Sequence, residues 1–258
     1  MKNLIGVDYS HWTKGVDPYK LIANSVSFAI VKNGEYISKW EGTSKDPYYE
    51  DDCYATNMQL LEDAELPHGS YFFYHPKVGN SKQLRLFESL YTKCKHDFPP
   101  VLDVEAHDGM FRWDYDTETA AKIANRIFVM LDGMEKISGR KPIVYTTASF
   151  WSYYVGDPNY GVDYKFWLAQ YNTQMTRWTE KIKNNVIMWQ FTDKLAIPGC
   201  PAMDGNHWMK TEEEFYAMTN KNDGTVPYPA EQIEQNRIKK HIFALSRANR
   251  MWLENITR

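Results

Sequence analysis

Short runs of β-branched and aromatic residues alternate along the chain with longer segments in which apolar residues recur at helical spacing. This alternation is typical of strand and helix units around a parallel sheet. Eight runs predict strands, and they are Leu4–Tyr9, Phe28–Lys32, Gly69–His75, Val101–Glu105, Pro142–Thr146, Phe166–Tyr171, Val186–Thr192 and, with the weakest pattern, Ala202–Asn206.

The segments between the earlier strands predict helices. They are Tyr49–Leu66, Ser81–Cys94 and Thr117–Ser138, the last beginning at an Asp116 or Thr117 cap. The later strands follow one another more closely. We therefore expect an α/β protein, an irregular (β/α) barrel of about five βα units plus three closely linked strands, with an appended C-terminal helix.

The end of the chain departs from this pattern. Residues 1–220 predict the barrel, residues 221–229 carry the Gly, Asn, Asp and Pro of a linker, and residues 230–258 predict an amphipathic helix. Its apolar stripe is interrupted by Asn249 and consists of Ile238, Ile242, Leu245, Trp252 and Ile256. The helix either packs back onto the barrel, or serves self-association or virion docking, or is drawn by its basic residues to an anionic cell surface.

Composition narrows the classes of function. The 258 residues carry a formal charge of −3, and no basic stretch is interleaved with aromatic residues, which argues against nucleic acid as a partner. The longest uncharged stretch, Pro142–Gly156, is shorter than the roughly 18 to 20 apolar residues of a membrane span. Cys53, Cys94 and Cys200 show neither zinc-ligand nor disulfide-framework spacing, and we expect no metal or cofactor. Aromatic residues make up 15% of the chain, which suits stacking on sugar faces.

Carboxylates fall at the ends of several predicted strands. In a barrel of parallel strands the active site lies at the C-terminal strand ends, where this sequence places Asp8, Asp103, Glu105 and Asp204. Stability does not require such a cluster, because like charges repel unless they are paired or protonated. Asp103 and Glu105 are two residues apart and face the same side, with Cα atoms about 6.6 Å apart. Paired carboxylates of this kind can carry out glycoside hydrolysis.

Eight motifs then occur in an order that resembles glycoside hydrolase family 25. They are Gly6–Trp12, Lys32 with Glu35, Gly69–Phe72, Pro99–Glu105, Lys141–Thr146, Phe166–Tyr171, Trp189–Asp193 and Asp204–Asn206. That family consists of lysozymes that cut the β-1,4 bond between N-acetylmuramic acid and N-acetylglucosamine in bacterial peptidoglycan, and many are phage endolysins. The resemblance implies an irregular (β/α) barrel, in agreement with the strand pattern.

The resemblance also implies roles for single residues. Glu105 would be the general acid and base, and Asp103 the nucleophile or the carboxylate that orients the substrate's acetamido group, with retention of configuration. Asp8 and Asp204 would be flanking acids. From the residues alone, we expect neighbouring carboxylates to raise the pKa of Glu105 while Asp103 stays charged. The candidate substrate-binding residues are Lys32, Glu35, Tyr71, Tyr74, Tyr145, Trp167, Tyr171 and Gln190.

Two motifs depart from the family pattern. Gly34 precedes Glu35 and Tyr36 follows it, where the family has a Gly after the Glu. The third strand reads Tyr-Phe-Phe-Tyr-His, so that either Tyr71 or Tyr74 could be the sugar-binding aromatic residue.

Rival functions fit the sequence less well. A chitinase-type barrel would need acids at Val101 and Phe98, and a metal-dependent hydrolase would show a tight His motif. A cysteine peptidase would need a Cys and His pair at the strand ends. The remaining alternative is a non-catalytic wall-binding or virion structural component. Because the first residues lack the apolar run of a secretory signal, we expect a muramidase held in the host cytoplasm until lysis or carried on the virion.

Overall fold

The computed structural model describes residues 4–36, 48–76, 78–106, 117–155, 163–171 and 184–219. The predicted linker and C-terminal helix, residues 221–229 and 230–258, lie outside the described residues. Within the described part of the chain, every helix is too short or too polar to cross a bilayer.

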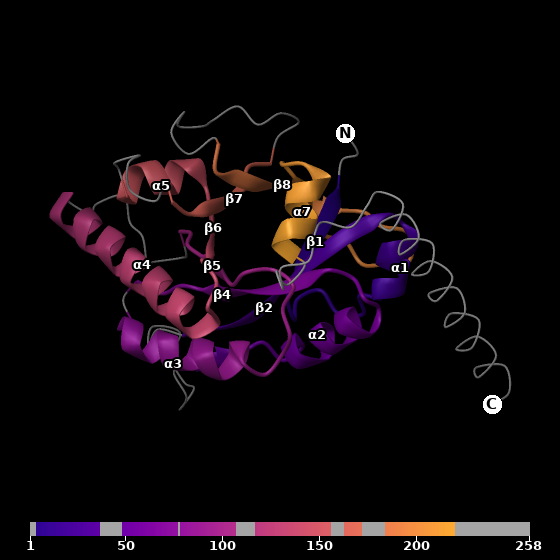
Figure 1. Cartoon of the computed structure of the whole chain (residues 1–258), viewed down its shortest axis with the longest axis horizontal. Coiled ribbons are helices and arrows are strands. Elements are labelled where there is room, and N and C mark those ends of the chain that lie inside the picture. The colour runs from indigo at the N-terminus through magenta and orange to yellow at the C-terminus, as the bar shows by residue number, and fades with distance from the viewer. Residues whose placement is uncertain are drawn as a thin grey trace, which may run out of the picture.

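Eight strands close into a barrel (Figure 1). In the order in which they pair around the ring, they are β1 (Ile5–Tyr9), β2 (Val26–Tyr36), β4 (His68–Phe73), β5 (Val101–Asp103), β6 (Ile143–Thr146), β7 (Lys165–Ala169), β8 (Val186–Leu195) and β9 (Met203–Trp208). Neighbours from β1 to β8 are parallel, whereas β9 is antiparallel to both β8 and β1. All eight predicted strands are present, and the predicted irregular barrel is confirmed.

Five strands are each followed by a helix before the next parallel strand. These helices are α1 (Pro18–Ala23), α2 (Tyr54–Asp63), α3 (Asn80–Tyr91), α4 (Thr117–Ser138) and α5 (Ala148–Tyr154). Helix α4 has the predicted bounds, and α3 differs from its prediction by a few residues. Helices α1 and α5 were not predicted, because they are too short to show a helical period. Both helices have an N-cap residue: the side chain of Asp17 accepts a hydrogen bond from Tyr19 N, and that of Thr147 accepts one from Phe150 N.

The predicted helix Tyr49–Leu66 is wrong in its first turn. Residues Tyr48–Glu50 form β3, which pairs antiparallel with the last residues of β2. A Cβ on Gly34 would meet Tyr49 O at 2.4 Å, so this close pairing of strands requires glycine at position 34. Helix α2 therefore begins only at Tyr54, after the chain has left the sheet.

Successive side chains along the strands point alternately into the barrel and toward the helices, so that they form two separate apolar clusters. On β2, Phe28 and Ile30 point into the barrel, whereas Ala29 and Val31 pack in the outer layer, where α2 and α3 contact the strand. This period of two is what a barrel strand with two buried faces shows.

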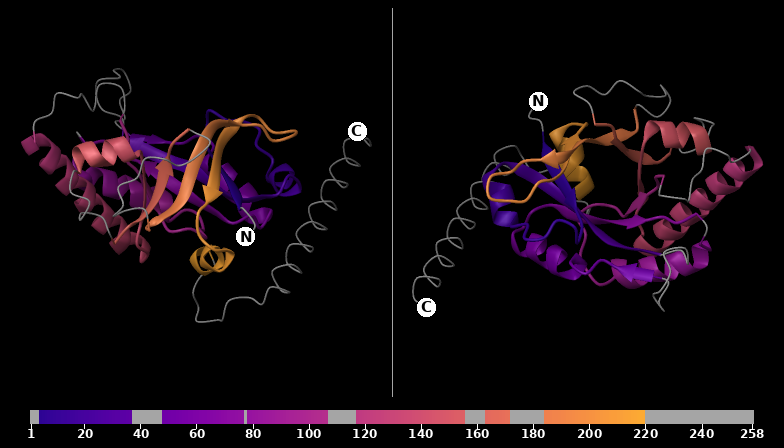
Figure 2. Two further views of the ribbon diagram at one scale, coloured as in Figure 1. Left: turned by 90° about the horizontal axis from the view of Figure 1, so that it is seen from above. Right: turned by 180° about the vertical axis from the view of Figure 1, so that it is seen from behind.

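The N-terminal end of the barrel is filled by aromatic side chains. Helix α7 (Glu212–Thr219) covers this end (Figure 2), and Phe215 packs on Phe28 and Trp208 with ring centroids 5.7 and 5.3 Å away. Arg140 fastens the helix by donating to Met218 O at 2.6 Å and to Asp97 O at 2.8 Å. The apolar end is thus closed, and the polar side chains of the interior gather at the C-terminal ends of the strands.

Candidate active site

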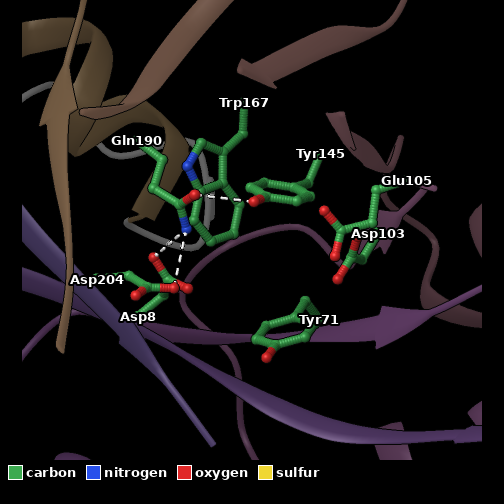
Figure 3. Close-up of a pocket in the computed structure, with 8 residues that line it drawn as sticks. All are labelled: Asp8, Tyr71, Asp103, Glu105, Tyr145, Trp167, Gln190 and Asp204. Carbon is green, nitrogen blue, oxygen red and sulfur yellow. Dashed lines mark hydrogen bonds between the residues drawn. The ribbon is translucent and has the colours of Figure 1, made fainter. Parts of the chain in front are cut away.

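A pocket opens at the C-terminal ends of the barrel strands (Figure 3). Its lining consists of Asp8, Tyr71, Asp103, Glu105, Tyr145, Trp167, Gln190 and Asp204. The structure therefore brings together all four carboxylates that the sequence placed at strand ends. Asp103 and Glu105 lie on one side of the pocket, and Asp8 and Asp204 lie on the other.

The strand register explains why the pocket contains these residues. Asp8 on β1 is paired directly with Asp204 on the antiparallel β9, and Asp103 on β5 is paired with Tyr145 on β6. Side chains directly opposite each other in neighbouring strands share one face of the sheet. The inward face of the closed barrel thus carries Asp8 beside Asp204 and, on other strands, Asp103 beside Tyr145.

The carboxylate of Asp8 is tightly held. Its Oδ2 accepts hydrogen bonds from Asn206 Nδ2 at 2.8 Å and from Gln190 Nε2 at 3.0 Å. Gln190 Nε2 also donates to Asp204 Oδ2 at 3.2 Å. Burial and the charge of Asp204 raise the pKa of Asp8 well above its usual range, although the two amides oppose the shift. Burial likewise raises the pKa of Asp204.

The amide of Gln190 is oriented from the other side. Its Oε1 accepts hydrogen bonds from the hydroxyls of Tyr145 at 2.8 Å and Tyr171 at 3.0 Å. Trp167 Nε1 donates to Asn206 Oδ1 at 2.7 Å, which fixes the second amide. Tyr145 and Trp167 are buried walls, whereas Tyr171 is 53% exposed at the rim. This side of the pocket is a connected hydrogen-bond network.

The Asp103 and Glu105 pair is built differently. Asp103 is buried, and its Oδ1 has no hydrogen-bond partner among the described residues, whereas Glu105 is partly exposed. Burial and then the charge of Glu105 raise the pKa of Asp103 well above its usual range, and the charge of Lys32 opposes them. The sequence does not show how deeply this side chain is buried, so it did not indicate that the pKa of Asp103 would be raised.

Lys32 and Glu35 form an ion pair outside the pocket lining. Lys32 Nζ lies 2.6 Å from Glu35 Oε1, and His75 Nε2 lies 2.8 Å from Glu35 Oε2. Lys32 also lies over the Phe73 ring, 5.2 Å from its centroid. Burial favours the neutral acid, but the hydrogen bond with His75 and the charge of Lys32 lower the pKa of Glu35 to about 2. Glu35 is therefore an ionised anchor for Lys32.

Of the two candidate aromatic residues, Tyr71 on β4 lines the pocket, whereas Tyr74, which directly follows β4, does not. Tyr74 is fully buried outside the barrel interior, and its hydroxyl donates to Asn80 Oδ1 at 3.1 Å. Tyr74 lies two positions after Phe72, so its side chain is on the same outer face as that of Phe72, whose ring packs edge-on against Phe87 of α3. The prediction of Tyr74 as a sugar contact is thus wrong, because one position along a strand reverses the face.

Two residues at the predicted strand ends support this site although they were not among the candidate site residues. Asn206 donates a hydrogen bond to the carboxylate of Asp8, and His75 is hydrogen-bonded to the carboxylate of Glu35. The signal for Asn206 was its spacing, since it lies two residues after Asp204 on the same strand face. In the described part of the chain, no group of three or more His, Cys, Asp and Glu side chains is arranged to hold a metal ion.

Comparison with known proteins places this geometry in a family. The sequence model of glycosyl hydrolases family 25 matches residues 7–200. The protein YegX of Escherichia coli K12 is 29% identical over 220 residues, which cover 83% of this chain and 73% of YegX. Lysozyme M1 of Streptomyces globisporus is 27% identical over 230 residues, which cover 83% and 71% of the two chains.

The fold is also that of a solved bacterial lysozyme. The structure from Streptomyces coelicolor superposes with a TM-score of 0.72 at 21% identity, and the match covers 85% of this chain and 98% of the other. Because the family match spans most of its residues, this chain belongs to the glycosyl hydrolases of family 25, as a lysozyme-like glycosidase.

Proposed function

We propose that this protein is an N-acetylmuramidase, which hydrolyses the β-1,4 bond between N-acetylmuramic acid and N-acetylglucosamine. Family membership implies peptidoglycan as the substrate. We assign Glu105 as the general acid and base and Asp103 as the carboxylate that stabilises the positive charge developing at the anomeric carbon. One observation carries the assignment, namely a buried carboxyl and a partly exposed carboxyl on the same strand end, both lining the pocket.

The difference in exposure suits the two roles. Glu105 at the mouth can reach a leaving oxygen, protonate it, and then take a proton from an incoming water molecule. Asp103 lies deeper, and its Oδ1 has no hydrogen-bond partner among the described residues, so it can interact with the reacting sugar unit. Removal of water around Asp103 strengthens any charge interaction it makes there.

The proton balance of the pair follows from its surroundings. Two carboxyl groups that share a site do not readily ionise together, so the pair retains a proton to higher pH than an isolated acid does. Burial and the charge of Glu105 raise the pKa of Asp103, and the charge of Lys32 opposes that rise. The proposed mechanism uses the form of the pair in which the retained proton is on Glu105, where the leaving oxygen arrives.

Asp103 can act in two ways that both retain configuration. As a nucleophile it would form a covalent glycosyl intermediate, and as an orienting base it would accept a hydrogen bond from the acetamido N–H of the substrate. A glycan without N-acetyl groups separates the two, because only the second mechanism needs the acetamido oxygen. Cleavage of de-N-acetylated glycan at a kcat close to that of normal glycan would identify a nucleophile, and loss of kcat would identify acetamido participation.

The remaining pocket residues would bind and shape the substrate. Asp8 and Asp204 place two acids opposite the reacting pair, and both have a raised pKa. Tyr71, Tyr145 and Trp167 line the pocket and Tyr171 stands at its rim, which makes them the candidates for sugar contacts. Gln190 would hold the two acids and the two phenols in place. Lys32 and Glu35 would act through Asp103, without contacting sugar.

The decisive experiment is to digest purified peptidoglycan, reduce the products with borohydride and identify the new reducing ends by mass spectrometry. We expect reduced muramic acid from the wild type and from Glu88→Gln, an exposed substitution on α3. Glu105→Gln should produce roughly a hundredfold to ten-thousandfold less, because the proton donor is lost.

Each other set of products would indicate a different activity. Reduced glucosamine would indicate a glucosaminidase, and free amines without new sugar ends would indicate peptide or amide cleavage. No products from the wild type, together with retention on the wall, would leave a non-catalytic wall-binding or virion structural component. A Glu105→Gln protein within about tenfold of the wild type would refute the role assigned to Glu105.

We further place this activity in phage-type host lysis, with the enzyme held in the host cytoplasm until lysis or carried on the virion. The support is the likeness of the motifs to a family that includes many phage endolysins. Cells that accumulate the enzyme should stay intact until chloroform permeabilises the inner membrane, and then lyse. Lysis during accumulation, before any permeabilisation, would contradict cytoplasmic storage.

A further inference from the structure

The loop after β1 presents an exposed tryptophan close to the pocket. Trp12 is 84% exposed, more than any other large hydrophobic side chain in the described residues. It follows Asp8, a pocket residue, by four positions, and it therefore emerges at the same end of the barrel. A single exposed apolar residue needs no functional explanation, but the loop that carries Trp12 is fixed by buried hydrogen bonds.

A buried carboxylate holds the loop. Asp51, whose side chain is inaccessible, accepts hydrogen bonds at Oδ2 from His11 N at 2.9 Å and from His11 Nδ1 at 2.8 Å. Its Oδ1 accepts a third from Cys53 N at 3.0 Å. Burying a carboxylate is costly unless it is fully hydrogen-bonded, as it is here. The fold thus devotes a buried acid to fixing the residue next to Trp12.

Three rings continue from this anchor. The centroids of His11 and Trp12 are 4.5 Å apart, and those of His11 and Tyr49 are 5.2 Å apart. We call Trp12, His11 and Tyr49 the aromatic platform. Tyr49 comes from β3, so the platform joins the loop after β1 to the hairpin that extends β2.

The platform lies beside the pocket. Tyr49 is paired across the strands with Glu35, the anchor of Lys32. Tyr71 lines the pocket, and its pKa is raised by burial, by the charges of Asp8, Asp103 and Asp204 and, to a smaller extent, by the charge of Asp51. Both links place the platform on the side of the pocket formed by β1, β2 and β4.

We propose that the aromatic platform is a further glycan subsite, where the indole of Trp12 stacks on a sugar ring of the strand that leaves the pocket. This proposal rests on the proposed function, because a peptidoglycan strand continues beyond the bond that is cut. The apolar face of a sugar ring suits an indole that is rigid, exposed and held in place. Holding successive sugars in register would also help to position the bond beside Glu105.

The test measures binding without turnover. Glu105→Gln protein is titrated calorimetrically with N-acetylglucosamine disaccharide and with longer oligomers of the same sugar. Adding Trp12→Ala should weaken the binding of long oligomers by about fivefold to thirtyfold and leave the disaccharide unchanged. Trp12→Tyr should retain most of the affinity. Met209→Ala, an exposed side chain that follows β9 at the opposite end of the barrel, is the matched control and should change neither.

Two results would overturn the subsite. One is unchanged affinity for long oligomers in the Trp12→Ala protein, and the other is an equal loss for the disaccharide, which would mean that Trp12 acts on the pocket itself. A matching melting temperature checks that the fold is intact. The proposed function fails separately, when the wild type releases no reduced muramic acid, and the titration still decides whether Trp12 contacts glycan.

Discussion

The two sides of the pocket hold their acids in opposite ways. On one side, Asp8 Oδ2 accepts two amide hydrogen bonds, and the amides are themselves fixed by Trp167 and by two tyrosines. On the other, Asp103 is equally buried, yet its Oδ1 has no partner among the described residues. A connected hydrogen-bond network stabilises one geometry, whereas an unsatisfied buried oxygen costs free energy of folding. The contrast indicates that the Asp8 side is scaffold and that the Asp103 side is kept for the substrate.

Removing the charge of Asp103 should break this contrast most strongly. We expect Asp103→Asn to lower kcat by roughly a hundredfold to a thousandfold, because a preorganised charge facing the reacting sugar is lost. The melting temperature at neutral pH should stay the same or rise, since an ionised buried carboxylate costs stability. Assays of kcat and thermal unfolding on the same preparation check both. A large fall in melting temperature would mean that Asp103 is part of the scaffold.

The pH dependence of stability has a definite sign here. A carboxyl whose pKa is raised by folding binds more protons in the native state, so its contribution is fully present below the unfolded pKa and is lost as pH rises through the folded pKa. The wild type should therefore lose stability between acid and neutral pH at this site. Asp103→Asn should flatten that part of the profile, and an unchanged profile would contradict the raised pKa.

On the scaffold side, Gln190→Ala should act mainly on stability. Gln190 is 1% exposed and contacts both acids and both phenols, so its removal leaves several buried groups without partners. We expect a loss of about 1–3 kcal/mol in the free energy of unfolding, measured by urea titration. The matched control is Gln59→Ala on the exposed face of α2, which should change stability little. Equal effects in the two variants would refute the scaffold role.

Glu35→Gln should have a smaller effect on kcat than Asp103→Asn, and it tests whether the Lys32 and Glu35 ion pair supports Asp103. Without its anion, Lys32 loses its anchor beside Asp103, and we expect kcat to fall by about tenfold with KM nearly constant. Glu35 has its pKa lowered to about 2 from 4.5, so its stabilisation is present above pH 4.5 and lost as pH falls toward 2. The difference in melting temperature between the wild type and Glu35→Gln should shrink over that window. A shift confined to KM would indicate direct contact with sugar.

The strands were predictable because each carries a local signal. Alternating β-branched and aromatic residues identify β2 and β6 without knowledge of their neighbours, and the acids at the strand ends follow from the same pattern. The hairpin at Tyr48–Glu50 was not predictable, since a three-residue strand depends on a partner segment elsewhere in the chain. The burial of Asp103 was missed for the same reason, because it depends on the neighbouring strands as well as on its own.

The sequence alone also did not decide whether Tyr71 or Tyr74 faces the pocket. Substitutions at these two positions have the smallest expected effects on stability and kcat. Tyr74→Phe removes a hydroxyl that donates to Asn80 outside the barrel, so we expect about 0.5–1.5 kcal/mol lower stability and unchanged kcat. Tyr71→Phe alters a pocket wall and should change kcat or KM with little loss of stability. The two substitutions delete the same atom three positions apart on one segment, and they are compared by urea titration and peptidoglycan digestion. If Tyr74→Phe lowered kcat as much as Tyr71→Phe does, the assignment of Tyr71 to the pocket and of Tyr74 to the outer layer would be refuted.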